Sequence, residues 1–494
     1  MMNEQGKSDR VIVPVKSPNK AGKQPVAEGM EGSALAKGNS SEQNTRRIQG
    51  RERVQNALGR VRQVAVREKK LKFTSLMHHI ANVDTLREAY FSLKRDAASG
   101  VDGMTWKRYG ENLEACLTDL ADRLKRGAYR AKPVKRTYIP KADGKQRPLG
   151  VPVLEDKIVQ YACVMVLNAV YETEFLGFSY GYRPGRSQHK CLDALYVGML
   201  TKKVNWIIDA DIRGFFDTID HGWLVKFIEH RIGDPRVVRL IRKWLNAGVM
   251  EQGRWRAVDE GTPQGGVISP LLSNVFLHYV LDLWIHHGRK TPSVSGDVIV
   301  VRWADDFVIG FQRRAAAERC LAELKKRFEK FGLALHPEKT RLIEFGPYAV
   351  TNRLRRGQGR PETFDFLGFT HICGKKRSNG MYTVVRRTAK KRMSRKLQEV
   401  KAELRRRMHE PVAQQGKWLG SVVGGFVRYH GVPTNAKAIM RFRFQIGGYW
   451  RHALRMRGSR KRVTWERMYR LIDRWLPPAT VCHPYPLRRM GVIT

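Results

Sequence analysis

The chain has 494 residues, with 92 Lys and Arg against 46 Asp and Glu, so its formal net charge is +46. A globular protein this basic repels itself unless a polyanion neutralises it, which makes nucleic acid the leading partner and a membrane surface the weaker one. No apolar run approaches the roughly 18 to 20 residues needed to span a bilayer. The six cysteines form no C-x-x-C pair, which argues against a zinc ribbon and suits a reducing compartment.

The N-terminal part is predicted to be a tail followed by helices. Residues 1–45 are rich in Gly, Ser, Lys, Asn and Glu and are expected to be disordered. A basic helix is predicted for 46–70, and its arginine-covered surface suits either solvent or RNA. Further helices are predicted for 73–93 and 109–124, separated by a glycine-containing loop at 97–103.

Two strands around a polar turn are predicted for 135–141 and 144–150. Lys141 and Arg147 flank that turn. A basic hairpin of this kind can grip a triphosphate. Considered alone, the hairpin favours ordinary surface charge over this function.

A buried strand that carries two acids is predicted for 206–212, with Asp209 and Asp211 inside it. An apolar helix at 155–171 precedes it, and a helix at 223–232 follows it, capped by Asp217 or Asp220.

A flexible loop at 261–266 leads into a helix predicted for 269–284. Residues 298–311, VIVVRWADDFVIGF, have the pattern of two short buried strands joined by a tight acidic turn. Burying the adjacent carboxylates of Asp305 and Asp306 without a partner is unfavourable. The turn alone is more typical of a solvated hairpin, but a divalent metal is the sharper hypothesis.

The order of elements from 206 to 345 is strand, helix, helix, hairpin, helix and strand. That order indicates an α+β fold, with an antiparallel sheet backed by helices on one face. A further hairpin is predicted to start at 364–369. From Arg387 onward the chain changes to basic helices interleaved with aromatics, which suits RNA contact or, alternatively, a helical bundle with an aromatic core.

The chemistry centres on Asp211, Asp305 and Asp306. These residues are distant in sequence but would meet at one edge of an antiparallel sheet. Phosphoryl transfer between nucleotides uses two divalent ions held by carboxylates. Mg²⁺ suits such hard oxygen ligands, because it keeps waters and substrate phosphates in its remaining positions.

Five motifs carry a resemblance to a known family. In chain order they are DIRGFFDTIDH at 211–221, GTPQGGVISPLLSN at 261–274, WADD at 303–306, GLALHPEKT at 332–340 and FLGF at 366–369. Together they resemble a group II intron-encoded protein, a reverse transcriptase joined to a maturase (X) domain. The resemblance covers roughly residues 51–486.

The resemblance implies a right-hand polymerase. Fingers and palm with an N-terminal extension would occupy 46–375, and an α-helical thumb and maturase region would occupy 376–487. Only a short C-terminal tail, 488–494, would follow, with no endonuclease domain. Mobility would then proceed without a second-strand cut by the protein itself.

The resemblance also implies the metal site. Asp211 and Asp305 would be the principal ligands of two Mg²⁺ ions, with Asp306 beside them and the carbonyl of Ile212 assisting. Asp209 and Asp217 are better explained as a surface acid and a helix cap. The acidic motif usually opens with Tyr, whereas Trp303 stands here, so altered nucleotide handling is expected.

The remaining implied roles concern nucleotide and primer. Lys141 and Arg147 would hold the incoming triphosphate, and Phe216 would exclude a 2′ hydroxyl. Gln264 would line the nucleotide pocket, and Lys339 would neutralise or protonate the departing pyrophosphate. The primer grip would consist of Phe366, Leu367 and Gly368.

The function predicted from these residues is an RNA-directed DNA polymerase that also binds its own intron RNA and assists splicing and mobility. Its partners would be intron RNA, an RNA template with a DNA primer, a DNA target and dNTPs, as a ribonucleoprotein in the bacterial cytoplasm. The sequence leaves open whether the protein forms a homodimer. Two alternatives compete: a reverse transcriptase of a retron, diversity-generating or CRISPR-linked element, and an RNA-binding splicing factor whose polymerase has decayed.

Overall fold

The computed structural model describes residues 37–140, 146–251, 254–256, 261, 265–289, 296–457 and 463–491. The predictions for Lys141 and Gln264, and those for residues 1–36, lie outside the described residues. Helix α1, Lys37–Arg67, starts before the predicted boundary at Arg46, so the last part of the predicted tail is helical.

The N-terminal helices pack around a buried central helix, and both long helices predicted before it are broken in two. Asn82 interrupts the first, because its side chain accepts hydrogen bonds from the backbone N–H groups of Asp84 and Thr85 and so starts a new helix. The helices are α2 (Met77–Ile80), α3 (Val83–Ser92), α4 (Trp106–Gly110), α5 (Leu113–Lys125) and the central α6 (Leu154–Tyr171).

The predicted basic hairpin is confirmed as β1 (Val134–Pro140) and β2 (Gln146–Val151), which pair antiparallel. Strand β1 also pairs in parallel with β4, Val249–Glu251, and β4 pairs with β5, Arg254–Arg256. The sequence analysis did not predict these last two short strands.

The central sheet has the strand order β6-β7-β3-β8, and each neighbouring pair is antiparallel. This confirms the predicted α+β class with an antiparallel sheet. The strands are β3 (Trp206–Ala210), β6 (Val298–Trp303), β7 (Asp306–Phe311) and β8 (Arg341–Glu344).

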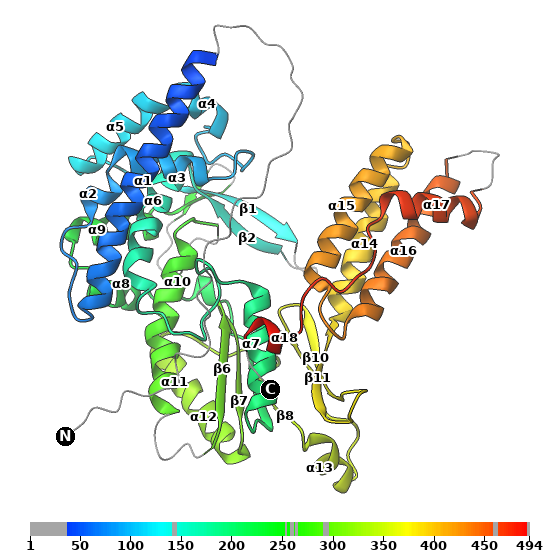
Figure 1. The fold of residues 1–494 in the computed structure, drawn as a ribbon. Helices are drawn as coiled ribbons and strands as arrows, with labels where there is room; N and C mark the ends of the chain where they lie inside the picture. Colours follow the sequence, from blue (N-terminus) through cyan, green and yellow to red (C-terminus); the bar gives the residue numbers. More distant parts are fainter. Residues whose placement is uncertain are drawn as a thin grey trace.

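Helices cover both faces of the central sheet, whereas cover on one face was predicted. Helix α12, Arg314–Lys330, packs on the face that carries Ile208 and Ile309. Helix α7, Gln188–Thr201, packs on the opposite face against Ile299 (Figure 1). The strands are apolar at consecutive positions, so both of their faces need burial.

One of the remaining helices differs from the prediction. The segment predicted as one helix from 269 to 284 contains a π-helical turn, which widens the helix by one residue per turn. The elements are η1 (Phe215–Asp217), α8 (His221–Arg231), α9 (Pro235–Leu245), α10 (Ser269–Leu277), the π-helical η2 (His278–Asp282), α11 (Leu283–Gly288) and α13 (Ala349–Arg355).

The C-terminal helical region has its own hydrophobic core and stands apart from the rest of the molecule (Figure 1). A small antiparallel sheet of β9 (Phe364–Phe366), β10 (Phe369–Lys375) and β11 (Tyr382–Thr388) leads into it. Its helices are α14 (Lys390–Arg406), α15 (Val412–His430), α16 (Ala436–Arg455) and α17 (Trp465–Trp475).

The chain then returns to the central part. Helix α18, Pro486–Arg489, lies beside α7, where Arg489 and Arg386 both pair with buried Asp193 at 3.1 and 3.0 Å (Figure 1). Two arginines, one before and one after the C-terminal helices, therefore tie this part of the chain to Asp193 of α7. No described helix combines the length and apolarity required to cross a membrane.

Candidate active site at the acidic turn

The acidic turn, residues 303–306, joins β6 to β7. Trp303 and Asp306 form the last pair of the ladder, so Ala304 and Asp305 are the two loop residues. Ala304 has φ of +56°, a conformation in which glycine is favoured at this position of a two-residue hairpin. Backbone strain of this kind persists only where surrounding structure fixes it, and it is frequent at functional sites.

The strand register brings Asp211 to the turn. Ala210 pairs with Phe307 in the antiparallel β3–β7 ladder, so the next residue, Asp211, falls opposite Asp306. Ile212 is buried and bridges to Leu335. The three predicted acids therefore come from the end of one strand and the adjoining hairpin turn.

A buried arginine, Arg302, holds the turn in place through hydrogen bonds. Arg302 is fully buried and donates five hydrogen bonds: two to Asp282 at 2.7 and 2.6 Å, and one each to Ser179, Asn274 and the carbonyl of Ala304. This uses all five guanidinium donors. The bond to Ala304, at 2.9 Å, fixes the strained residue directly.

Sequence reasoning missed Arg302 and its partners. The available signal was an arginine inside the apolar run VIVVRW, at a position that faces the same side as Val300. A charge on a buried face requires a partner. Asp282, which lies in the π-helical turn, supplies it at 0% exposure.

The carboxyls at the turn destabilise one another's charged forms. Burial, together with the neighbouring charges of Asp305, Asp211 and Asp209, raises the pKa of Asp306 to about 7. Burial and Asp211 also raise the pKa of Asp305, while Arg147 and Arg302 act in the opposite direction. A cation between these carboxyls would remove the repulsion.

The residues present fit a divalent cation. They offer hard carboxylate oxygens whose negative charge is only partly offset by nearby positive charge, which suits Mg²⁺. Lys339 contributes part of that charge, because its Nζ lies 2.6 Å from Oδ2 of Asp211. Among the described residues, no three His, Cys, Asp or Glu side chains lie so that they could hold an ion by themselves, so waters and substrate phosphates would have to supply the remaining ligands.

Other acids near the turn have structural partners. Asp209 pairs with Arg341 at 3.2 Å. Asp220, rather than Asp217, caps α8 by accepting a hydrogen bond from the N–H of Trp223. Asp217 ends the short 3₁₀ turn η1.

Of the predicted nucleotide-contacting residues that the structure describes, Arg147 and Lys339 lie beside the acids. Arg147, at the start of β2, is close enough to stabilise the charged form of Asp305 and so lowers its pKa. The half-buried Phe216 contacts Phe215, with ring centroids 5.4 Å apart. Gly261 packs against the backbone of Phe216, where a Cβ would clash.

The predicted primer grip forms a tight turn between β9 and β10. Phe366 pairs with Phe369, and Leu367 and Gly368 between them have φ of +48° and +80°. Leucine rarely adopts this left-handed conformation. Tyr429 of α15 supports it by donating a hydrogen bond to the carbonyl of Leu367 at 2.7 Å.

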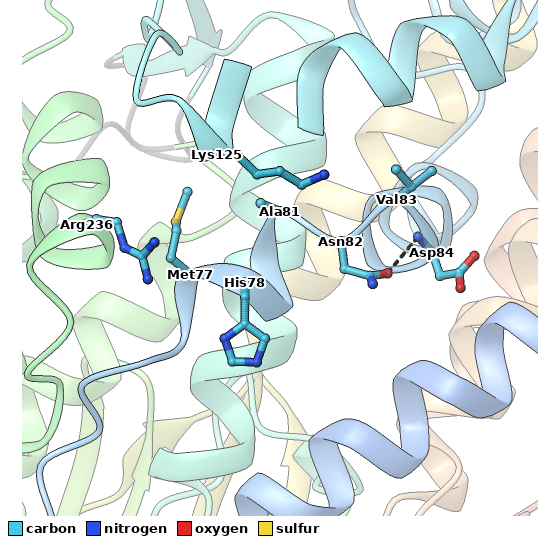
Figure 2. Close-up of a pocket in the computed structure, with 8 residues that line it drawn as sticks. All are labelled: Met77, His78, Ala81, Asn82, Val83, Asp84, Lys125 and Arg236. Carbon is cyan, nitrogen blue, oxygen red and sulfur yellow. Dashed lines mark hydrogen bonds between the residues drawn. The ribbon is translucent and has the colours of Figure 1, made fainter. Parts of the chain in front are cut away.

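A cavity of about 370 Å³ lies elsewhere, beside the N-terminus of α3 (Figure 2). It is lined by Met77, His78, Ala81, Asn82, Val83, Asp84, Lys125 and Arg236. None of the predicted site residues lines it, so the candidate site is not this cavity.

Comparison with known proteins identifies the family. The model of the reverse transcriptase (RNA-dependent DNA polymerase) family matches residues 139–371. Protein YkfC of Escherichia coli is 34% identical over 338 residues, which are 60% of this chain and 88% of the relative. Group II intron-encoded protein LtrA of Lactococcus lactis is 35% identical over 228 residues, which are 44% of this chain and 37% of the relative.

A plant protein is also similar to part of this chain. Nuclear intron maturase 2 of Arabidopsis thaliana is 29% identical over 191 residues, 29% of this chain and 25% of the relative. The chain thus covers most of YkfC but well under two thirds of the relatives named after introns. With the matched domain and these relatives, the chain belongs to the reverse transcriptase (RNA-directed DNA polymerase) family, in the group of group II intron-encoded reverse transcriptases and maturases.

Proposed function

We propose that this protein copies RNA into DNA by two-metal-ion nucleotidyl transfer at Asp211, Asp305 and Asp306. The observation that carries the proposal is the convergence of three carboxyls whose pKa values are raised or whose charge is already paired with a lysine. Reverse transcriptases as a family use divalent metal ions, and two Mg²⁺ ions fit these oxygen ligands.

Each residue around the turn has a proposed task. Asp211 and Asp305 hold the ions, with Asp306 and the Ile212 carbonyl beside them. Arg147 and Lys141 bind the triphosphate, and Phe216 and Gln264 shape the nucleotide pocket. Lys339 moves from Asp211 to the leaving pyrophosphate, which its flexible, half-exposed side chain permits.

The proposed architecture is that of a right hand. Residues 46–375 form the fingers and palm, and 376–487 form the thumb and maturase region. Support comes from the separate hydrophobic core of α14–α17 and from the small sheet that connects it to the central sheet. The turn at Phe366, Leu367 and Gly368 would then hold the primer between the two parts.

We also propose that the protein binds its intron RNA and assists splicing and mobility as a ribonucleoprotein. Support comes from the net charge of +46 and from relatives named as intron-encoded proteins and maturases. In splicing the RNA would perform the cutting and joining, while the protein would supply basic surface that neutralises phosphates.

The test is primer extension on an RNA template with Mg²⁺, using Asp305→Ala. We expect extension to fall at least a hundredfold, because the cation that stabilises the transferred phosphate loses a ligand. The matched control, Asp119→Ala, removes an exposed carboxylate from α5 and should leave extension unchanged.

The same two variants separate the two proposed activities. Asp305→Ala should still bind intron RNA and support splicing at low Mg²⁺. Wild-type extension by Asp305→Ala would refute the metal-site assignment, and absent RNA binding by the wild-type protein would refute the maturase role.

A further inference from the structure

We propose that an exposed aromatic row on α16 and α17 is a stacking surface for unpaired RNA bases. The row consists of Phe444, Trp465 and Tyr469, which are 61%, 37% and 51% exposed. The inference rests on the proposed RNA-binding function and assigns part of it to named side chains.

The rings are arranged as a row. Phe444 and Trp465 are nearly parallel, with an interplanar angle of 8° and centroids 6.2 Å apart. Trp465 and Tyr469 follow at 27° and 5.6 Å. The row joins α16 to α17, which contact each other, so the three rings lie next to one another across the two helices.

Packing of the helix does not explain the exposure of these rings. Helix α16 buries Ile439, Phe442, Ile446 and Trp450 on its opposite face, and these residues build the core of the C-terminal region. The exposed face therefore carries apolar rings in addition to a complete core. Large apolar residues that gather on a surface usually mark a binding site.

The same face of α16 is strongly basic. At helical spacing around Phe444 it carries Lys437, Arg441, Arg451 and Arg455, and α16 contains no acidic residue. Arg451 lies over Trp465, with its guanidinium carbon 4.6 Å from the ring centre. Among the described residues, Lys437, Arg441 and Arg455 have no carboxylate within ion-pair distance.

This combination identifies the kind of partner. Cations attract a phosphate backbone, and flat rings accept bases that are not already stacked in a duplex. Gly448 lies between Phe444 and Arg451 and leaves open space above the backbone, so a planar base can approach the row. A single-stranded RNA segment matches both the charge and the rings, whereas a double helix offers its bases only at the grooves.

The test measures binding of an unstructured RNA strand and of a blunt RNA duplex to the full chain over a series of salt concentrations. Trp465→Leu keeps apolar volume and removes the ring. We expect it to weaken single-strand binding roughly tenfold, within the range for loss of one base stack, and to leave duplex binding unchanged. Trp465→Phe should restore most of the affinity.

Salt dependence distinguishes the rings from the cations. The dependence of log affinity on log salt should keep its slope in Trp465→Leu, because no phosphate contact is lost. It should fall by about 0.7 in Arg441→Gln, which removes one cation on the same face. Tyr348→Leu removes a ring outside the row that is more exposed than Trp465 and should bind like the wild type.

Several results would overturn the assignment. Equal single-strand affinity for wild type and Trp465→Leu would do so, as would equal losses on strand and duplex. A Trp465→Leu variant that changes self-association of the free protein but not RNA binding would mark the face as a protein contact. Failure of the wild-type chain to bind RNA at all would instead count against the proposed function.

Discussion

The acidic turn and the aromatic row of α16 and α17 differ in which side chains they bury and which they expose. At the turn, the buried side chains of Arg302 and Asp282 pair with each other, and the hydrogen bond from Arg302 to the carbonyl of Ala304 fixes the backbone that carries the partly exposed acids. In the row, apolar rings are exposed and flanked by arginines without fixed carboxylate partners. The first arrangement suits chemistry that depends on position, since one misplaced ligand is costly. The second arrangement suits the binding of a flexible polyanion, for which many weak contacts add up to the affinity.

The largest expected effect is on the free energy of unfolding, and it tests this difference between the two regions. Arg302→Met should lower the free energy of unfolding by about 3–5 kcal/mol, because it leaves the buried carboxylate of Asp282 uncompensated. Arg407→Met, which breaks exposed ion pairs with Glu403 and Glu410 in the C-terminal region, should leave the free energy of unfolding almost unchanged, because water screens such pairs. Urea unfolding of both variants measures the difference.

A double variant checks the cause. Arg302→Met combined with Asp282→Leu removes both charges and should recover part of the lost stability, although not the support for Ala304. Similar losses of unfolding free energy in Arg302→Met and Arg407→Met would contradict the view that the turn is rigidly fixed while the C-terminal surface tolerates change.

The second effect is a loss of stability at low pH. Burial, together with nearby arginines, lowers the pKa values of His371 and His430 to about 3. The unfolded chain protonates these side chains below about 6.5 and the folded chain does not. The free energy of unfolding should therefore fall as the pH drops from 7 to 5, by up to about 2 kcal/mol per histidine.

His371 stacks on Phe364 inside the small sheet, and His430 of α15 contacts Phe369 of the same sheet, so acid should loosen this sheet and its contact with α15. Unfolding curves at pH 7 and pH 5 measure the loss. His371→Phe keeps an aromatic ring against Phe364 and should flatten the pH dependence. An unchanged dependence in that variant would place the acid sensitivity elsewhere.

The smallest effect lies at the boundary between the two regions. Tyr429→Phe removes the hydrogen bond to Leu367, a loss of about 1 kcal/mol. If the turn at Leu367 holds the primer, the KM for primer–template should rise a few-fold while kcat stays the same. Steady-state extension kinetics measure both quantities, and Tyr382→Phe, in the small sheet to which the turn at Leu367 belongs, is the control.

The sequence allowed prediction of those parts of the site that follow from local pattern. Alternating and continuous apolar runs indicated β3, β6 and β7, and the acids at their ends indicated where the carboxyls would meet. The antiparallel sheet was predicted correctly for the same reason.

Features that depend on distant partners were not predicted. The bonds of Arg302 involve residues 20 and 123 positions away, so no local pattern indicates them. Helix α7 was missed although it covers a whole face of the sheet, because its buried residues are interspersed with Gly198 and polar side chains. The support of Leu367 by Tyr429 spans 62 positions.

The central claim is that the acidic turn performs polymerisation and the C-terminal helices bind RNA. The most direct test measures Mg²⁺-dependent primer extension and single-strand RNA affinity in parallel for wild type, Asp305→Ala and Trp465→Leu. We predict that Asp305→Ala loses extension and keeps RNA affinity, while Trp465→Leu loses RNA affinity roughly tenfold and keeps extension at saturating template. Loss of both activities in both variants would contradict the account.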